Sequence, residues 1–185
     1  MRRIALVLFL VILFSLLTAP ARATPGFCGL SWGSLPKAAE HFTADPVTGA
    51  RAGRHECYDR LVLDHAGEAP GYLVRYVDQV TSPGSGAVVP VAGGARLQIT
   101  AQAPAHHPDG RPSVPWRVGD RLVDLAALPT LPSGFSTFRG TVFAGSFEGY
   151  SDYGLGVRAR LPFRVLRLDG PGGGSRLVID VAHMW

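Results

Sequence analysis

The sequence of 185 residues contains no asparagine and only one lysine, Lys37, so arginine carries nearly all of its positive charge. The codons for asparagine and lysine are rich in A, whereas those for arginine, alanine, glycine and proline are rich in G and C. We therefore expect a bacterial gene of high GC content. This bias describes the genome and leaves the function of the protein open.

Long apolar runs are absent except near the N-terminus, and that run is too short to span a membrane. Met1–Arg3 is positively charged, and Ile4–Leu17 is apolar apart from Ser15. Ala21-Arg22-Ala23 then places small residues at the two positions that signal peptidase recognises. Since a membrane-spanning helix needs about 20 residues, this pattern predicts a secretory signal over residues 1–23. An uncleaved N-terminal anchor is the alternative.

Cleavage after Ala23 leaves 162 residues, a length that suits one domain with a hydrophobic core. Three arginines leave with the signal, so the formal net charge falls from +4 to about +1. A protein without a basic excess is not a dedicated nucleic-acid binder. We expect a secreted, cell-wall-associated protein with no membrane span after signal cleavage.

Cysteine is scarce, with Cys28 and Cys57 as the only two. In an exported protein such a pair predicts a disulfide, which would stabilise the fold by roughly 3–4 kcal/mol. The alternative is a reactive thiol with His55 as a neighbouring base. The disulfide would pin residues 24–53, a segment rich in Gly, Pro and Ala that we expect to be a tether, with one or two helical turns in Leu35–Phe42.

Short apolar stretches separated by Gly and Pro predict an all-β domain over residues 54–185. Ala95–Gln102 shows the clearest alternation of polar and apolar residues, which is typical of a strand with one solvated face. Seven or eight such strands in about 120 residues favour a sandwich or a barrel. The predicted strands are Arg60–His65, Tyr72–Val80, Ala95–Gln102, Phe138–Phe143, Leu155–Arg160, Phe163–Leu168 and Arg176–Val181, the last two joined by the glycine-rich turn Asp169–Ser175.

Two further patterns have the residue types of a catalytic or a metal site. Gly29-Leu30-Ser31-Trp32-Gly33 matches the G-x-S-x-G motif, but no room exists before it for the strand that such a nucleophile requires. His106-His107-Pro108-Asp109 has ligand residue types in a spacing that fits no closed zinc site. It belongs to Pro104–Gly134, which we expect to be a long excursion between strands. We assign no catalytic residue, metal or cofactor.

The turn around Phe147–Gly154 is the candidate ligand site. Its tyrosines, Tyr150 and Tyr153, are expected to be exposed in a Gly/Ser/Asp-rich turn, where aromatic rings commonly stack on sugars or anchor partners. Glu148 can accept hydrogen bonds from hydroxyl or amide groups, and Arg158 is the charged partner nearby. In the alternative, the rings cap the core and Glu148 pairs with Arg158.

Several stretches, taken in this order, resemble the AMIN-like proteins that actinobacteria export, and together they cover most of residues 54–182. The resemblance implies a β-sandwich of two small sheets and a non-catalytic module that localises envelope proteins, with peptidoglycan or another envelope polymer as the proposed ligand. The family supplies no catalytic residue. The matching stretches are Cys57–Asp64, Tyr72–Val77, Gly94–Leu97, Phe143–Gly149, and the terminal pair Phe163–Leu168 and Arg176–Val181.

The function expected is therefore that of an extracytoplasmic module that binds a cell-wall glycan or an envelope protein. Two alternatives stay open. One is a small secreted hydrolase that uses Ser31 or a histidine–carboxylate site, which requires convergent polar residues in one cleft. The other is a carrier with an apolar cavity inside the sandwich.

Overall fold

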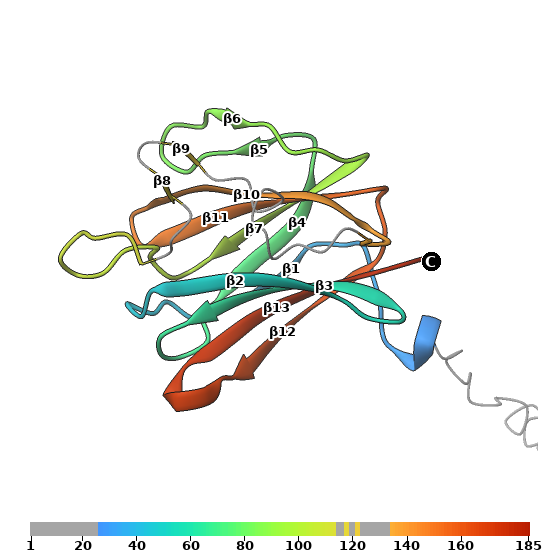
Figure 1. Ribbon diagram of the computed structural model, residues 1–185, viewed down its shortest axis with the longest axis horizontal. Helices are drawn as coiled ribbons and strands as arrows, with labels where there is room; N and C mark the ends of the chain where they lie inside the picture. Colours follow the sequence, from blue (N-terminus) through green and yellow to red (C-terminus); the bar gives the residue numbers. More distant parts are fainter. Residues whose placement is uncertain (1–25, 114–116, 119–120, 123–133) are drawn as a thin grey trace, which may run out of the picture.

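The computed structural model describes residues 26–113, 117–118, 121–122 and 134–185. They form two antiparallel β-sheets stacked face to face, and a small hairpin lies over the outer face of one sheet (Figure 1). The predicted all-β sandwich is confirmed, since helical structure in the described part of the chain is limited to two short 3-10 turns. The predicted signal, residues 1–23, lies outside the described residues.

Sheet A has four strands in the order β12-β13-β3-β2, and sheet B has five in the order β1-β4-β7-β11-β10. The strands of sheet A are β2 (Val47–Arg54), β3 (Tyr58–His65), β12 (Phe163–Asp169) and β13 (Ser175–Ala182). Those of sheet B are β1 (Lys37–Ala39), β4 (Tyr72–Val77), β7 (Ala95–Ala101), β10 (Phe138–Phe147) and β11 (Tyr150–Val157). Two short hairpins pair β5 (Val80–Thr81) with β6 (Val88–Val89), and β8 (Arg117–Val118) with β9 (Arg121–Leu122).

The main core fills the space between the sheets. Alternate residues of each central strand point into it: Leu61 and Leu63 from sheet A lie in the same cluster as Leu97 and Ile99 from sheet B, and all four are at most 1% exposed. Full burial of such an aliphatic side chain contributes about 1.5–3 kcal/mol. The sandwich is therefore a filled scaffold, and its strand ends, loops and outer faces are the places for ligand contacts.

A second, smaller apolar cluster lies on the outer face of sheet B. Val80 and Val91, from the region of the β5–β6 hairpin, pack with Val142 and Ala144 of β10. Gly154 of β11 permits this approach, because a Cβ atom there would lie 2.7 Å from the Val91 side chain. The β5–β6 hairpin therefore covers part of this face, as Figure 1 shows.

The seven predicted strands correspond to β3, β4, β7 and β10 to β13, with different ends. The predicted hairpin of β12 and β13 is confirmed. The largest shift is in β11, which begins at Tyr150 rather than at the predicted Leu155. Glycines at Gly154 and Gly156 interrupt the alternation of side chains and so hide the first half of this strand in the sequence.

The segment 24–53, expected to be a tether, contains two strands. The helical turns predicted in Leu35–Phe42 are wrong, because Lys37–Ala39 pairs with β4 at the edge of sheet B. Strand β2 is rich in Gly and Ala, which are poor strand formers. It forms nevertheless because Val47 is buried in the main core and Ala50 packs against it.

The predicted disulfide between Cys28 and Cys57 is present, with the two Cα atoms 6.4 Å apart. It joins the 3-10 turn η1 (Phe27–Gly29) to the residue that precedes β3. Both cysteines of the sequence are therefore paired, and the alternative of a reactive Cys57 thiol assisted by His55 is wrong.

The long excursion between strands that was predicted over Pro104–Gly134 is described in part. Residues 104–113 form a loop with an isolated bridge between His106 and Pro112, and β8 and β9 form a short hairpin beyond it. Residues 114–116, 119–120 and 123–133 lie outside the described residues.

Candidate functional site

The hairpin between β10 and β11 ends in a two-residue turn. Glu148 and Gly149 occupy it with φ values of 49° and 81°, which is the pattern of a type I′ turn. A non-glycine residue at positive φ costs on the order of 1 kcal/mol, and such strain is concentrated at functional positions. Phe147 and Tyr150 are paired across the strands on either side of the turn.

Three exposed aromatic rings gather at this turn, and we call them the aromatic tip: Phe42, Phe147 and Tyr150. They are 58%, 48% and 40% exposed. The Phe42 ring meets the Tyr150 ring edge-on at 6.1 Å between centroids. Gly149 makes room for Phe42, since a Cβ atom there would lie 2.5 Å from that ring. A cluster of exposed rings on a rigid turn is a typical binding surface.

A cavity of about 310 Å³ opens beside the aromatic tip, and Phe147 forms part of its wall. Its wall also contains apolar groups from Pro83 and Pro112 and polar groups from His106 and Ser146. The Ser146 hydroxyl donates to the carbonyl oxygen of Tyr150 at 2.8 Å and accepts from the Ala105 amide at 3.2 Å. These hydrogen bonds fasten the cavity wall to the hairpin.

A buried carboxylate lies two residues beyond Tyr150 on the same strand. Asp152 is 6% exposed, and its carboxylate accepts hydrogen bonds from Thr100 and Gln98. Burial raises the pKa of Asp152, and the hydrogen bonds from Thr100 and Gln98 partly oppose this shift. These contacts tie the outer face of β11 to β7 behind the tip.

The structure separates the four residues of the predicted ligand site. Glu148 and Tyr150 lie together at the turn. The Tyr153 ring is fully buried and packs against Phe143, with 5.3 Å between ring centroids. Arg158 follows the opposite end of β11, so it does not form the alternative ion pair with Glu148.

Two residues of the aromatic tip were missed by the sequence analysis as ligand contacts. Phe147 lies at the start of the predicted turn but is not among the predicted ligand residues. Phe42 is more than 100 positions from Tyr150, and no local signal places it there. The pairing of β1 with β4 and hydrogen bonds to Gln102 from the amides of His41 and Thr43 bring this loop to the hairpin.

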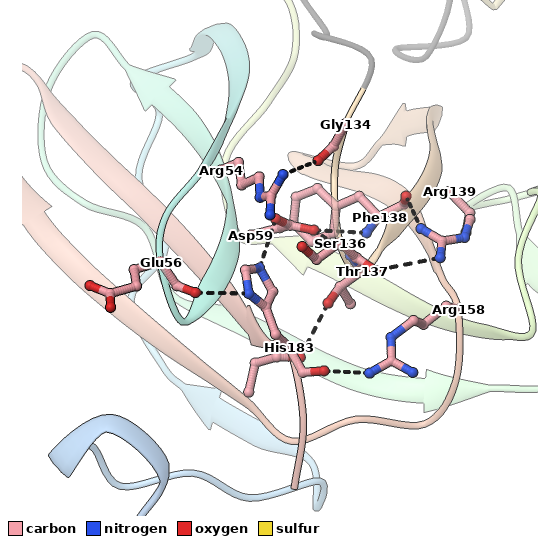
Figure 2. Close-up of polar contacts among 11 residues, drawn as sticks. Arg54, Glu56, Asp59, Gly134, Ser136, Thr137, Phe138, Arg139, Arg158 and His183 are labelled. Atoms are coloured by element: carbon pink, nitrogen blue, oxygen red, sulfur yellow. Dashed lines mark hydrogen bonds and ion pairs between the residues drawn. The ribbon is translucent and has the colours of Figure 1, made fainter.

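A histidine and a buried carboxylate form a pair at the far end of the sandwich (Figure 2). Asp59 is fully buried, and its Oδ1 lies 3.0 Å from Nε2 of His183. Its Oδ2 accepts from the backbone amides of Thr137 at 2.5 Å and Phe138 at 3.1 Å. The other ring nitrogen of His183, Nδ1, lies 3.1 Å from the carbonyl oxygen of Glu56.

This arrangement fastens the chain rather than activating a nucleophile. Both ring nitrogens of His183 face acceptors, whereas a general base needs one nitrogen directed at the proton it removes. Arginines surround the pair and donate to backbone carbonyls: Arg54 to Gly134 at 3.0 Å, Arg139 to Phe138 at 2.9 Å, and Arg158 to His183 (Figure 2). The pair therefore links the end of β13 to the start of β10.

A second histidine faces a serine inside the sandwich. His65 and Ser175 are cross-strand partners, 3% and 5% exposed. Within the described residues, neither the His65 ring nor the Ser175 hydroxyl has a hydrogen-bond partner, so they do not form a dyad. Ser31 is exposed and lies between the turn η1 and Gly33, outside both sheets. No cluster of three metal-ligating side chains occurs in the described part of the chain.

The burial of His65 predicts that the protein becomes less stable as the pH is lowered. Burial lowers the pKa of His65 to about 4 from 6.5, with Asp64 and Asp45 opposing the shift. Between these values the unfolded chain binds a proton that the folded chain excludes, so the free energy of unfolding decreases as the pH falls from 6.5 towards 4. The difference amounts to about 3 kcal/mol.

Urea denaturation at pH 7 and pH 4 measures this effect. His65→Leu should remove about 3 kcal/mol of the pH dependence and leave the stability at pH 7 equal or higher, because two unpaired polar atoms leave the interior. His55→Gln is the control, since His55 is exposed. Wild-type pH dependence in His65→Leu would show that another group is responsible.

The structure thus defines the class of protein, a disulfide-fastened antiparallel β-sandwich that presents aromatic rings at one end. Residues 45–183 match the family model of the AMIN-like domain, and the chain belongs to this family. Membership indicates a module of the cell envelope. Comparison with curated proteins and with solved structures found no match. No helix in the described residues has the length and apolar character needed to cross a membrane.

Proposed function

We propose that this protein is a secreted, non-catalytic module that binds a cell-wall glycan, with peptidoglycan as the ligand, through its aromatic tip. The observation that carries the proposal is the gathering of Phe42, Phe147 and Tyr150, all exposed, around a rigid two-residue turn. Family membership supports the envelope setting. No observation on the described residues favours the hydrolase or the carrier.

The chemistry of the aromatic tip suits a carbohydrate chain. The apolar face of an aromatic ring packs on the C–H face of a sugar, and a ring held by its neighbours loses little entropy on binding. Glu148, at the point of the turn, accepts hydrogen bonds from sugar hydroxyls. The adjoining cavity of about 310 Å³ lies at the lower end of the range of small-molecule sites, roughly 300–1,000 Å³, and offers a recess for one unit of the chain.

Removal of two rings from the aromatic tip tests the proposal. The double variant Phe147→Ala with Tyr150→Ala should lower retention on isolated cell wall by about tenfold or more, since each ring contributes roughly 1–2 kcal/mol. Both rings are about half exposed, so the melting temperature should change little. The measurement is co-sedimentation of residues 24–185 with purified cell wall.

Leu168→Ala provides the matched control, because this apolar side chain is as exposed as Tyr150 but lies on β12 of the other sheet. It should retain wild-type binding. Equal retention of the wild type and the double variant would show that the aromatic tip is not the binding surface. An equal loss in Leu168→Ala would show that the retention is nonspecific.

A further inference from the structure

A row of charged side chains crosses the outer face of sheet A. Arg60 of β3, Asp180 of β13 and Arg164 of β12 are register partners on three neighbouring strands. Their chain neighbours Leu61 and Ile179 belong to the main core, so by alternation the charged residues point outward. This row lies on the opposite sheet from the aromatic tip.

The row contains two arginines but only one carboxylate, so it has more positive charge than is needed to neutralise Asp180. Asp180 is fully buried and accepts from Nε and Nη2 of Arg60 at 2.7 and 2.9 Å, and from Nε of Arg164 at 2.8 Å. Arg60 alone forms the two-pronged pair that neutralises a buried carboxylate. Arg164 is therefore a surplus charge, and the three residues together have a net charge of +1. A guanidinium has five N–H donors, and Asp180 uses only one from Arg164.

Two aromatic rings, 5.9 Å apart between centroids, lie against the surplus guanidinium. The carbon at the centre of the Arg164 guanidinium lies 5.3 Å from the Trp32 ring centroid and 5.2 Å from that of Tyr58. The disulfide next to Tyr58 holds the segment that contains Trp32, and the Trp32 indole N–H donates to the Phe27 carbonyl at 2.7 Å. The arginine is thus held in one orientation while its side chain remains 21% exposed.

We propose that Trp32, Tyr58, Arg60 and Arg164 form a second binding site, which takes the C-terminal carboxylate of a peptide outside the cell. The net charge of +1 matches a single carboxylate, and the planar guanidinium presents paired donors that fit its two oxygens. The two adjoining rings shield one side of the guanidinium from water and so strengthen the pair. His55, stacked on Tyr58 at 4.6 Å and exposed, borders the site.

Isothermal titration with a minimal probe tests this site. An N-acetylated trialanine peptide with a free C-terminal carboxylate should bind at least about tenfold more tightly than its C-terminal amide. Equal affinity for the two peptides would overturn the proposal. A phosphoserine-containing peptide amide is the third arm, and tighter binding of this peptide than of the carboxylate would overturn the choice of ligand.

Single-residue variants test whether the carboxylate peptide binds on the outer face of sheet A. Arg164→Gln leaves Asp180 with its pair from Arg60 and should weaken carboxylate binding by about tenfold or more. Arg51→Gln, on the same sheet and paired with Asp64, is the control and should bind as the wild type does. Unchanged affinity in Arg164→Gln would overturn the proposal.

Two further variants complete the test. If Arg164→Gln does not fold, Trp32→Ala replaces it, because Trp32 lies outside the sheets; a several-fold loss is expected, and unchanged affinity overturns the proposal. The double variant Phe147→Ala with Tyr150→Ala should bind the carboxylate peptide normally. The carboxylate site and the glycan site can therefore fail independently of each other.

Discussion

Asp59→Ala should lower the free energy of unfolding by about 3–5 kcal/mol. This loss is a large fraction of the total stability of a typical domain, about 5–15 kcal/mol. The carboxylate is fully buried and holds the amides of Thr137 and Phe138 together with the ring of His183. Its removal leaves the two buried amides and the partly buried His183 ring without this acceptor, and each buried unpaired group costs about 1–3 kcal/mol. Urea denaturation at pH 7 measures the loss.

The conservative variant Asp59→Asn separates hydrogen bonding from charge. Its amide oxygen can still accept from the backbone, but its NH₂ group cannot accept from His183. We expect a loss smaller than that of Asp59→Ala. A loss below about 1 kcal/mol in Asp59→Ala would contradict the role given to this residue in fastening the chain.

Tyr153→Ala should also cost about 3–5 kcal/mol, whereas Tyr150→Ala should cost less than about 1 kcal/mol. The two tyrosines are three positions apart on β11, and this spacing places them on opposite faces of sheet B. Tyr153 is 0% exposed within the main core, while Tyr150 is 40% exposed at the aromatic tip. Removal of Tyr153 therefore leaves a cavity, and removal of Tyr150 changes a surface.

Binding should show the reverse order. Tyr153→Ala, measured well below its melting temperature so that it is folded, should be retained on cell wall as strongly as the wild type. Tyr150→Ala should be retained more weakly than the wild type. Thermal denaturation and co-sedimentation give the stability and the cell-wall retention of each variant. A large loss of stability in Tyr150→Ala would assign that ring to the core, as in the structural alternative for this turn.

The same two tyrosines show how far the sequence predicts the site. The turn itself was predictable from its glycines, and so was the exposure of Tyr150 and Glu148. The burial of Tyr153 was not, because Gly154 and Gly156 mask the start of β11. Glycine is needed at Gly154 because Val91 packs directly on that strand, a contact between distant segments that no local pattern reveals.

The N-terminal segment shows the same limit for the fold. Strand β2 lacks β-branched residues after Thr48, and it forms because Val47 and Ala50 close an edge of the core. The disulfide was predictable, because it follows from a predicted export signal and a cysteine pair rather than from packing. Its position beside Tyr58 and Trp32, which builds the carboxylate site, depends on the three-dimensional arrangement alone.

The most direct test of glycan binding at the aromatic tip is an NMR titration of residues 24–185 with soluble peptidoglycan fragments. Backbone amide shifts should be largest at Phe147, Glu148, Gly149 and Tyr150 and should saturate with increasing ligand. The double variant Phe147→Ala with Tyr150→Ala should show no saturable shift at Glu148 and Gly149. Absence of any saturable shift at the turn in the wild-type protein would contradict the account.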